Sequence, residues 1–209
     1  MDYECRENGR LSAECGVGSG EWGVGSGQWA VRGAMNYYFV PMNEAYAQEI
    51  VIHWVYGGEY AIHDYAHEAD HMQDGTSWGK GLFAVLNDDG DLVGELTTEF
   101  FDADDVCVAY DDFNPQTLNA AEMWLGFGLK PALTGRGLGA AFVAACIDFA
   151  VRTHCYAGEA VRLGVPASNT RAIKVYQRVG FTIFNRVMGE VAGQTFEAVQ
   201  MKKVLEKRP

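Results

Sequence analysis

Three closely spaced glycines in the stretch GLKPALTGRGLG, residues Gly128–Gly139, constrain the fold of this chain more than any other feature. An apolar segment precedes them and the run AAFVAACIDFAVRTH follows, so the pattern predicts a strand, a tight turn and a helix. Because glycine has no Cβ, the backbone N–H groups of such a turn can converge on one ligand. The helix adds its free N-terminal N–H groups and the positive end of its dipole. The pattern therefore predicts a phosphate or pyrophosphate site.

A second glycine-rich region lies near the N-terminus. The near-copies GVGSGEW and GVGSGQW occupy Gly16–Trp22 and Gly23–Trp29. Their glycine spacing resembles a dinucleotide-binding loop, but no strand pattern precedes them and no apolar helix pattern follows. A Gly/Ser-rich composition is typical of a flexible segment. We therefore expect a flexible leader over residues 1–33 and one folded domain over residues 34–209.

Charge and cysteine usage narrow the functional classes. The formal net charge of −12 disfavours nucleic-acid binding, which needs a basic surface, and is compatible with a cationic substrate. No run of about 18 apolar residues predicts a membrane span, and the N-terminus lacks a secretory signal pattern. The five cysteines form no C-x-x-C pair, and their number is odd. The simplest interpretation is a reduced, intracellular protein. We expect a cytoplasmic protein with no membrane or nucleic-acid partner.

Hydrophobic periodicity predicts a mixed α/β sheet. Asn43 is a plausible N-cap for a helix that runs to about Tyr56 and ends at Gly57–Gly58. Further helices are expected from the glycine turn to about Thr153 and over Ser168–Arg178. The segment Asp102–Asn114 has a loop composition. Strands are expected at Met35–Pro41, Gly81–Asp88, Leu92–Phe101, Glu122–Leu129, Ala160–Pro166, Phe181–Val187 and Phe196–Val204.

A second motif follows the glycine turn, in the segment VRLGVPASNTRAIKVYQRVGF. Asn169, Ala172 and Tyr176 share one helical face, and Gly180 and Phe181 follow them. A strand, a P-x-x-x-G-x-G-x-G turn beginning at Pro131, a helix and then N-x-x-A-x-x-x-Y-x-x-x-G-F resemble the GNAT superfamily of acetyl-coenzyme A-dependent N-acyltransferases. The match covers about Met123–Phe181. The sequence LTGRGLG is similar to that of a bacterial subgroup of GNAT proteins whose substrates are undefined.

The resemblance implies a fold and a cosubstrate. The fold would be a GNAT-like mixed sheet of about six to seven strands, splayed in the middle and flanked by about four helices. Acetyl-coenzyme A would lie between the strands Glu122–Leu129 and Ala160–Pro166, and no metal would take part. Thr134 stands where the family usually has Arg or Gln, and Arg136 is a candidate compensating charge. The expected cofactor-binding residues are Leu129, Thr134, Gly135, Arg136, Gly137, Leu138, Gly139, Asn169 and Ala172.

The resemblance also implies a direct transfer mechanism. A backbone N–H near Leu129 would bind the thioester oxygen, and a neutral amine would attack the carbonyl. Tyr176 would protonate the departing thiolate, because a phenol with a pKa of ~10 suits a leaving group of similar basicity. The residue that deprotonates the amine is left open. Glu122 ranks narrowly first, and Glu95 and Glu99, which share one face of their strand, are alternatives.

His63, His67 and His71 recur at four-residue intervals. On one helix they would form a stripe, and histidines at i and i+4 can bind zinc, but surface decoration is the commoner reason for such a pattern. As acceptors we expect small-molecule amines or protein N-terminal or lysine amines, with the protein a monomer or homodimer. The alternative function is a GNAT module that binds acyl-coenzyme A as a sensor or partner-binding domain without efficient turnover.

Overall fold

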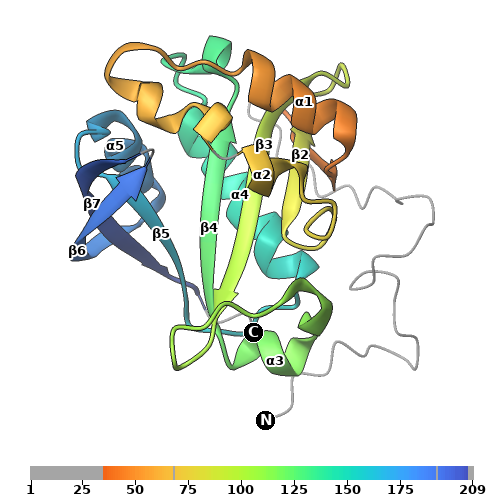
Figure 1. Cartoon of the computed structure of the whole chain (residues 1–209). Helices are drawn as coiled ribbons and strands as arrows, with labels where there is room; N and C mark the ends of the chain where they lie inside the picture. The colour runs from red at the N-terminus through yellow and green to blue at the C-terminus, as the bar shows by residue number, and fades with distance from the viewer. Residues whose placement is uncertain (1–34, 68, 192, 207–209) are drawn as a thin grey trace.

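The computed structural model describes residues 35–67, 69–191 and 193–206, so the expected leader with its two tryptophan repeats lies outside the described residues. Seven strands form one mixed sheet in the order β1-β2-β3-β4-β5-β7-β6 (Figure 1). This confirms the mixed α/β class. The strands are β1 Tyr38–Pro41, β2 Leu82–Leu86, β3 Leu92–Phe101, β4 Glu122–Leu129, β5 Ala160–Pro166, β6 Thr182–Val191 and β7 Gln194–Val204.

Helices cover both faces of the sheet. The α-helices are α1 Glu44–His53, α2 Ala69–Gln73, α3 Pro115–Asn119, α4 Gly139–Thr153 and α5 Thr170–Val179. The 3₁₀ helices are η1 Gly58–His63, η2 Tyr65–His67, η3 Tyr110–Asp112 and η4 Pro131–Leu133. In Figure 1, α1 and α2 lie in front of the sheet and α4 lies behind it.

The ends of helix α1 show how local signals and burial compete. Asn43 caps it as expected, since its side chain accepts a hydrogen bond from the Tyr46 N–H at 3.0 Å. The helix ends at His53 rather than near Tyr56, so the expectation that Gly57–Gly58 ends it is wrong. The next residue, Trp54, has left the helical conformation and is buried in the core, only 1% exposed. Burial of this large side chain agrees with an earlier end of the helix.

Two hydrophobic clusters hold the layers together. One lies between the sheet and helices α4 and α5 and contains Phe142, Cys146 and Ile147 of α4. The other packs α1 and the 3₁₀ segments on the opposite face, with Ile50, Trp54 and Tyr65 at its centre. The period of 3.6 residues on α4 is confirmed, because Phe142 and Cys146 are almost fully buried.

Strands β4 and β5 pair only at their first residues and then diverge, as Figure 1 shows. Their register partners are Met123 with Val161 and Trp124 with Arg162. At this closed end the Tyr156 hydroxyl lies 3.3 Å from the Met123 N–H and 3.2 Å from the Ala160 carbonyl. The sheet is therefore continuous at one end and splayed at the other.

Helix α3 was not expected from the sequence. It begins at Pro115 behind the N-cap Asn114. Among the described residues, the thiols of Cys107 and Cys146 are free, and the expectation of a reduced protein stays a prediction. Within the described ranges, no helix is both long and apolar enough to cross a membrane.

Candidate active site

The inner edge of the splay presents backbone N–H groups from β4. The Lys130 N–H donates to the Val93 carbonyl at 2.9 Å, which sets the hydrogen-bonded pairs between β4 and β3. In an antiparallel ladder these pairs alternate with residues whose polar groups point away. The N–H groups of Phe127 and Leu129 therefore point towards β5, which has already diverged. They are available to a ligand in the splay.

The glycine turn lies just beyond the end of β4. Gly135 and Gly137 have φ angles of +75° and +80°, and a Cβ on either would meet no atom within 4 Å. Only glycine adopts this conformation readily. Among the described residues, the backbone N–H groups of residues 135–141 have no hydrogen-bond acceptor. A row of free donors followed by the N-terminus of α4, which has 15 residues, has the chemistry to bind an anion.

The other residues of the turn have separate roles. A Cβ on Gly139 would lie 3.2 Å from the Val175 side chain, so this glycine lets α4 approach α5. The Thr134 hydroxyl donates to the Pro131 carbonyl at 2.8 Å, so it serves the turn itself. The Arg136 side chain is exposed and, within the described part of the chain, makes no ion pair. Its charge remains available to an anionic ligand.

Helix α5 carries Tyr176 to the inner side of the splay. Its ring centroid lies 5.9 Å from that of Phe127 and 6.0 Å from that of Phe181. Burial raises the pKa of the Tyr176 phenol, and the Glu95 carboxylate and then the Cys146 thiolate raise it further. The phenol therefore stays protonated across the physiological range. Asn169 caps the helix by accepting a hydrogen bond from the Ala172 N–H at 3.1 Å.

A tyrosine–carboxylate network lies against the end of β4. The Tyr56 hydroxyl donates to the Leu129 carbonyl at 3.0 Å, and the Tyr65 hydroxyl donates to Glu95 Oε1 at 2.7 Å. The Tyr65 hydroxyl occupies the space that a Cβ on Gly128 would need, at 1.8 Å from that position. Glu95 is 3% exposed and also accepts from the Thr97 hydroxyl at 3.1 Å. Gly128 thus lets a buried carboxylate approach β4.

A family model described as the acetyltransferase (GNAT) family matches residues 48–181, which is more than half of the chain. The chain belongs to the GNAT family of acetyltransferases. The match includes the glycine turn, the splay and Tyr176. It confirms the family inferred from the two motifs, and with it an acyltransferase with a GNAT-like sheet. No curated protein matches the chain.

Solved structures share the fold at low sequence identity. The Arabidopsis thaliana NAA60 complex with acetyl-coenzyme A has a TM-score of 0.54 and 16% identity, and the match covers 81% of this chain and 99% of that one. Spermidine/spermine N-acetyltransferase SpeG from Vibrio cholerae, in complex with manganese ions, has a TM-score of 0.51 and 15% identity, covering 80% and 92%. A chimera of Vibrio cholerae SpeG with hSSAT reaches 0.56 at 12% identity, covering 80% and 94%.

In this GNAT domain the three candidate bases lie at different places. Glu122 begins β4 at the closed end of the splay, where it forms an ion pair with Arg162. Glu95 and Glu99 lie on one face of β3 beside Gly128 and Trp124, and Glu99 is partly buried. Of the three, Glu95 alone contributes to the raised pKa of Tyr176. The structure therefore brings Glu95, not Glu122, into the neighbourhood of the predicted acid.

The three histidines do not lie on one helix. The last residue of η1 is His63, the last residue of η2 is His67, and His71 lies in α2. The i, i+4 stripe that would favour zinc is therefore not formed. Among the described residues, no group of three or more His, Cys, Asp or Glu side chains is arranged to hold a metal ion.

Sequence reasoning missed three contributors to this site. Phe127 offers an inward N–H and packs against Tyr176, whereas only Leu129 was singled out. Tyr56 and Tyr65 lie 73 and 30 residues from their partners Leu129 and Glu95, so no local spacing connects them. The glycine at position 128 was a weak signal, since a glycine within a strand often marks close approach by another group.

Proposed function

We propose that this GNAT protein transfers the acetyl group of acetyl-coenzyme A directly to a primary amine. The observation that carries the proposal is the splay between β4 and β5, which has inward N–H groups on one side, the glycine turn at its open end and Tyr176 within it. A thioester needs these three elements together: an anchor for the phosphates, a donor for its oxygen and an acid for its sulfur.

The cosubstrate would bind along this splay. Its pyrophosphate would accept hydrogen bonds from the free N–H groups of the glycine turn, with Arg136 as an added positive charge. Its pantetheine arm would run beside β4. The N–H groups of Phe127 and Leu129 are about 7 Å apart along the strand. We assign the thioester oxygen to Phe127, because its side chain packs against Tyr176, and the arm to Leu129.

Proton movements would complete the transfer. The protonated acceptor first loses a proton to Glu95, which receives it through the hydroxyl of Tyr65. The neutral amine then attacks the carbonyl carbon and the C–S bond breaks. The nitrogen, now bonded to the acetyl carbon, loses its second proton to water, and Tyr176 protonates the thiolate. The protonated Glu95 and the ionised Tyr176 return to their starting states by exchange with water. Glu122 and Glu99 remain the alternative bases.

The acceptor side favours a cationic amine. Glu95 and Glu99 share one face of the sheet, and the whole chain carries a formal net charge of −12. On the same face, Gly128 of β4 lets Glu95 and the Tyr65 hydroxyl lie against the strand. These features suit a protonated amine on a small molecule, such as a polyamine or an amino compound, or an N-terminal or lysine amine of a protein.

Amine-dependent release of free thiol tests the proposal. Acetyl-coenzyme A is incubated with spermidine, amino acids, lysine peptides and free N-terminal peptides, and the acetylated product is identified by mass. We expect at least one cationic amine to give stoichiometric product and thiol. Glu95→Gln should lower turnover about a hundredfold, and Glu122→Gln less than tenfold. The reverse order would reassign the base, and tight cofactor binding without product would favour a sensor module.

A further inference from the structure

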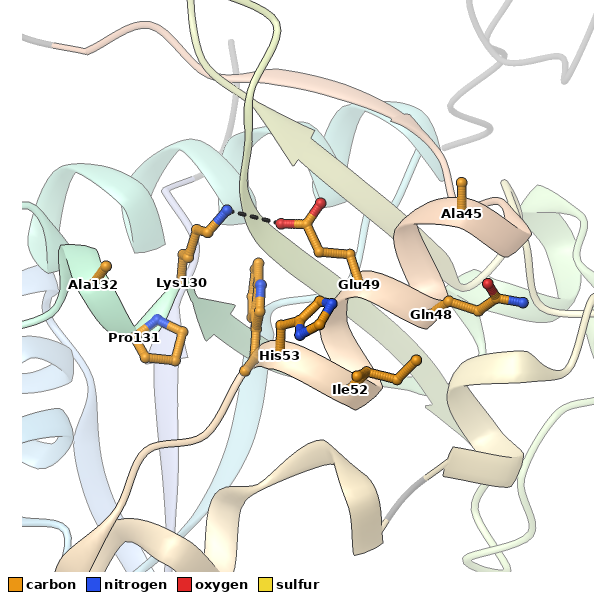
Figure 2. A pocket seen from close by; sticks show the side chains of 9 residues that line it. Ala45, Gln48, Glu49, Ile52, His53, Lys130, Pro131 and Ala132 are labelled. Carbon is orange, nitrogen blue, oxygen red and sulfur yellow. Dashed lines mark hydrogen bonds and ion pairs between the residues drawn. The ribbon is translucent and has the colours of Figure 1, made fainter.

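A pocket separate from the splay lies between α1 and the start of the glycine turn. Its volume is about 670 Å³, within the range of small-molecule sites. Residues of α1 form one side, and Lys130, Pro131 and Ala132 form the other (Figure 2). None of the lining residues is one to which we assign cofactor or acceptor contacts, although Trp54 packs edge-on against Tyr65.

One ion pair crosses this pocket. Lys130 Nζ lies 2.8 Å from Glu49 Oε1, and each side chain is 36% exposed. Figure 2 shows the two groups pointing towards one another from opposite walls. A half-exposed pair of this kind contributes little to stability, so a ligand can replace it at small cost. The pocket thus holds one cationic and one anionic group, and each can exchange its present partner for a charged group of a ligand.

The remaining lining offers apolar surface. Trp54 also lines the pocket, but its indole N–H has almost no exposed surface and is not available to a ligand there. Ile52 on the same wall is 62% exposed, which is high for an aliphatic side chain. An aliphatic group of a ligand would cover it.

We propose that this pocket binds a zwitterion, namely an amino acid or a short peptide with both termini free. A purely anionic ligand would take Lys130 and leave Glu49 unpaired, and a purely cationic one would do the reverse. A zwitterion pairs with both, its carboxylate with Lys130 and its ammonium with Glu49, and leaves neither charge of the pocket unpaired. Its side chain contacts Ile52 and Pro131.

The site adds regulation to the proposed function, and only the coupling to acetyl-coenzyme A rests on that function. The Lys130 carbonyl accepts from the Leu133 N–H at 2.8 Å, and the Pro131 carbonyl accepts from the Thr134 N–H at 3.1 Å. Ligand contacts on Lys130 therefore reach the glycine turn through one short 3₁₀ helix. Zwitterion and cosubstrate change each other's affinity by the same factor, as linkage requires.

Calorimetric titration of the full chain without acetyl-coenzyme A tests the site independently of catalysis. The probes are the common L-amino acids and leucyl-leucine, each beside its C-terminal amide and its N-acetyl derivative. We expect saturable binding of at least one zwitterion and a loss of about tenfold or more when either charge is removed. No saturable binding, or equal binding of the amide, overturns the proposal.

Variants locate the site on the protein. Lys130→Met and Glu49→Gln should each weaken binding about tenfold or more, whereas Lys80→Met, which breaks the Lys80–Asp111 ion pair outside the pocket, should not. The proposed site is overturned if Lys80→Met weakens zwitterion binding as much as Lys130→Met does. It is also overturned if Glu95→Gln weakens binding and Lys130→Met does not. If saturating zwitterion leaves the affinity for acetyl-coenzyme A unchanged, only the coupling is overturned. If the protein transfers no acetyl group to amines, the proposed function fails but the titration still tests the pocket.

Discussion

The left-handed backbone of Gly137 belongs to the turn to which we assign the pyrophosphate of the cosubstrate. Gly137→Glu should abolish acetyl-coenzyme A binding, because the side chain fills the anion site and repels the pyrophosphate. Gly90→Glu is the matched control, since Gly90 also has a φ of +80° and open space around its Cβ position, but lies in the turn between β2 and β3. Both should lose about 1 kcal/mol of stability from backbone strain. Calorimetry that finds equal cofactor affinity in the two variants would contradict the placement of the turn.

His154 supplies a pH-dependent contribution to stability. Burial lowers the pKa of this imidazole from 6.5 to about 4, and its Nε2 lies 2.9 Å from the Thr98 hydroxyl. The unfolded chain therefore takes up a proton at a higher pH than the folded chain does. This contribution is present above pH 6.5, falls between about pH 6.5 and pH 4, and is then constant.

The loss between pH 7.5 and 4.5 should be on the order of 2–3 kcal/mol. Urea unfolding of the unaltered protein and of His154→Gln at both pH values measures it as the difference between their pH dependences. Identical pH dependence of the two proteins would show that burial of His154 does not perturb its pKa.

The candidate site residues that the sequence singled out belong to local motifs, and their roles stay predictions. The turn glycines and Tyr176 occur at fixed sequence spacings within one turn and one helix. Their local structure could therefore be predicted from the sequence. The approach of Tyr65 and Glu95 to Gly128 depends on the pairing of β3 with β4 and on the fold of a 3₁₀ segment. No periodicity in the chain encodes these contacts, which is why Glu122 ranked above Glu95.

Among the elements, the contact between β3 and α4 depends on a glycine. A Cβ on Gly94 would lie 2.4 Å from the Phe142 ring and 3.0 Å from the Gly128 carbonyl. Gly94→Ala should therefore lower the free energy of unfolding by about 1–3 kcal/mol through overpacking. Gly164→Ala is the control in β5, because its Cβ would meet no atom within 4 Å. Equal denaturant midpoints for the two variants would refute this account of the packing.

The predicted bounds of helices and strands were right where polar residues or glycines at the ends of an element coincide with the limits of its buried side chains. Strands β4 and β5 begin and end at the predicted residues, and α5 ends at Val179, just before the left-handed Gly180. The predicted end of α1 is wrong, and the sequence predicted no definite element over residues 58–73, which form two 3₁₀ segments and the short helix α2. Such segments have weak propensity signals of their own.

For the whole molecule, the net charge of −12 should affect how a cationic acceptor is captured. A negative field attracts a cation over a distance that salt shortens, from about 30 Å at 0.01 M to about 8 Å at 0.15 M. The kcat/KM for a cationic amine should fall severalfold between these ionic strengths. An uncharged acceptor or the kcat at saturation should change little. A kcat/KM that does not change with ionic strength would show that the net charge does not attract the acceptor.

The splay is the whole-molecule feature on which the proposed chemistry depends. It was expected from the resemblance to the GNAT family, while the strand pairings that close one end and open the other come from the structure. The turn, the inward N–H groups and Tyr176 can face one ligand only because β5 leaves β4 after two register pairs.

Single-turnover acetyl transfer by Tyr176→Phe tests the central claim most directly. The enzyme is saturated with acetyl-coenzyme A, mixed with a reactive amine and followed by thiol release, while calorimetry measures cosubstrate affinity. We predict a chemical step slower by about a hundredfold with nearly unchanged affinity. For the unaltered enzyme, no loss of rate should appear up to pH 10, because the pKa of Tyr176 is raised. An unchanged transfer rate in Tyr176→Phe would contradict the assignment of Tyr176 as the acid.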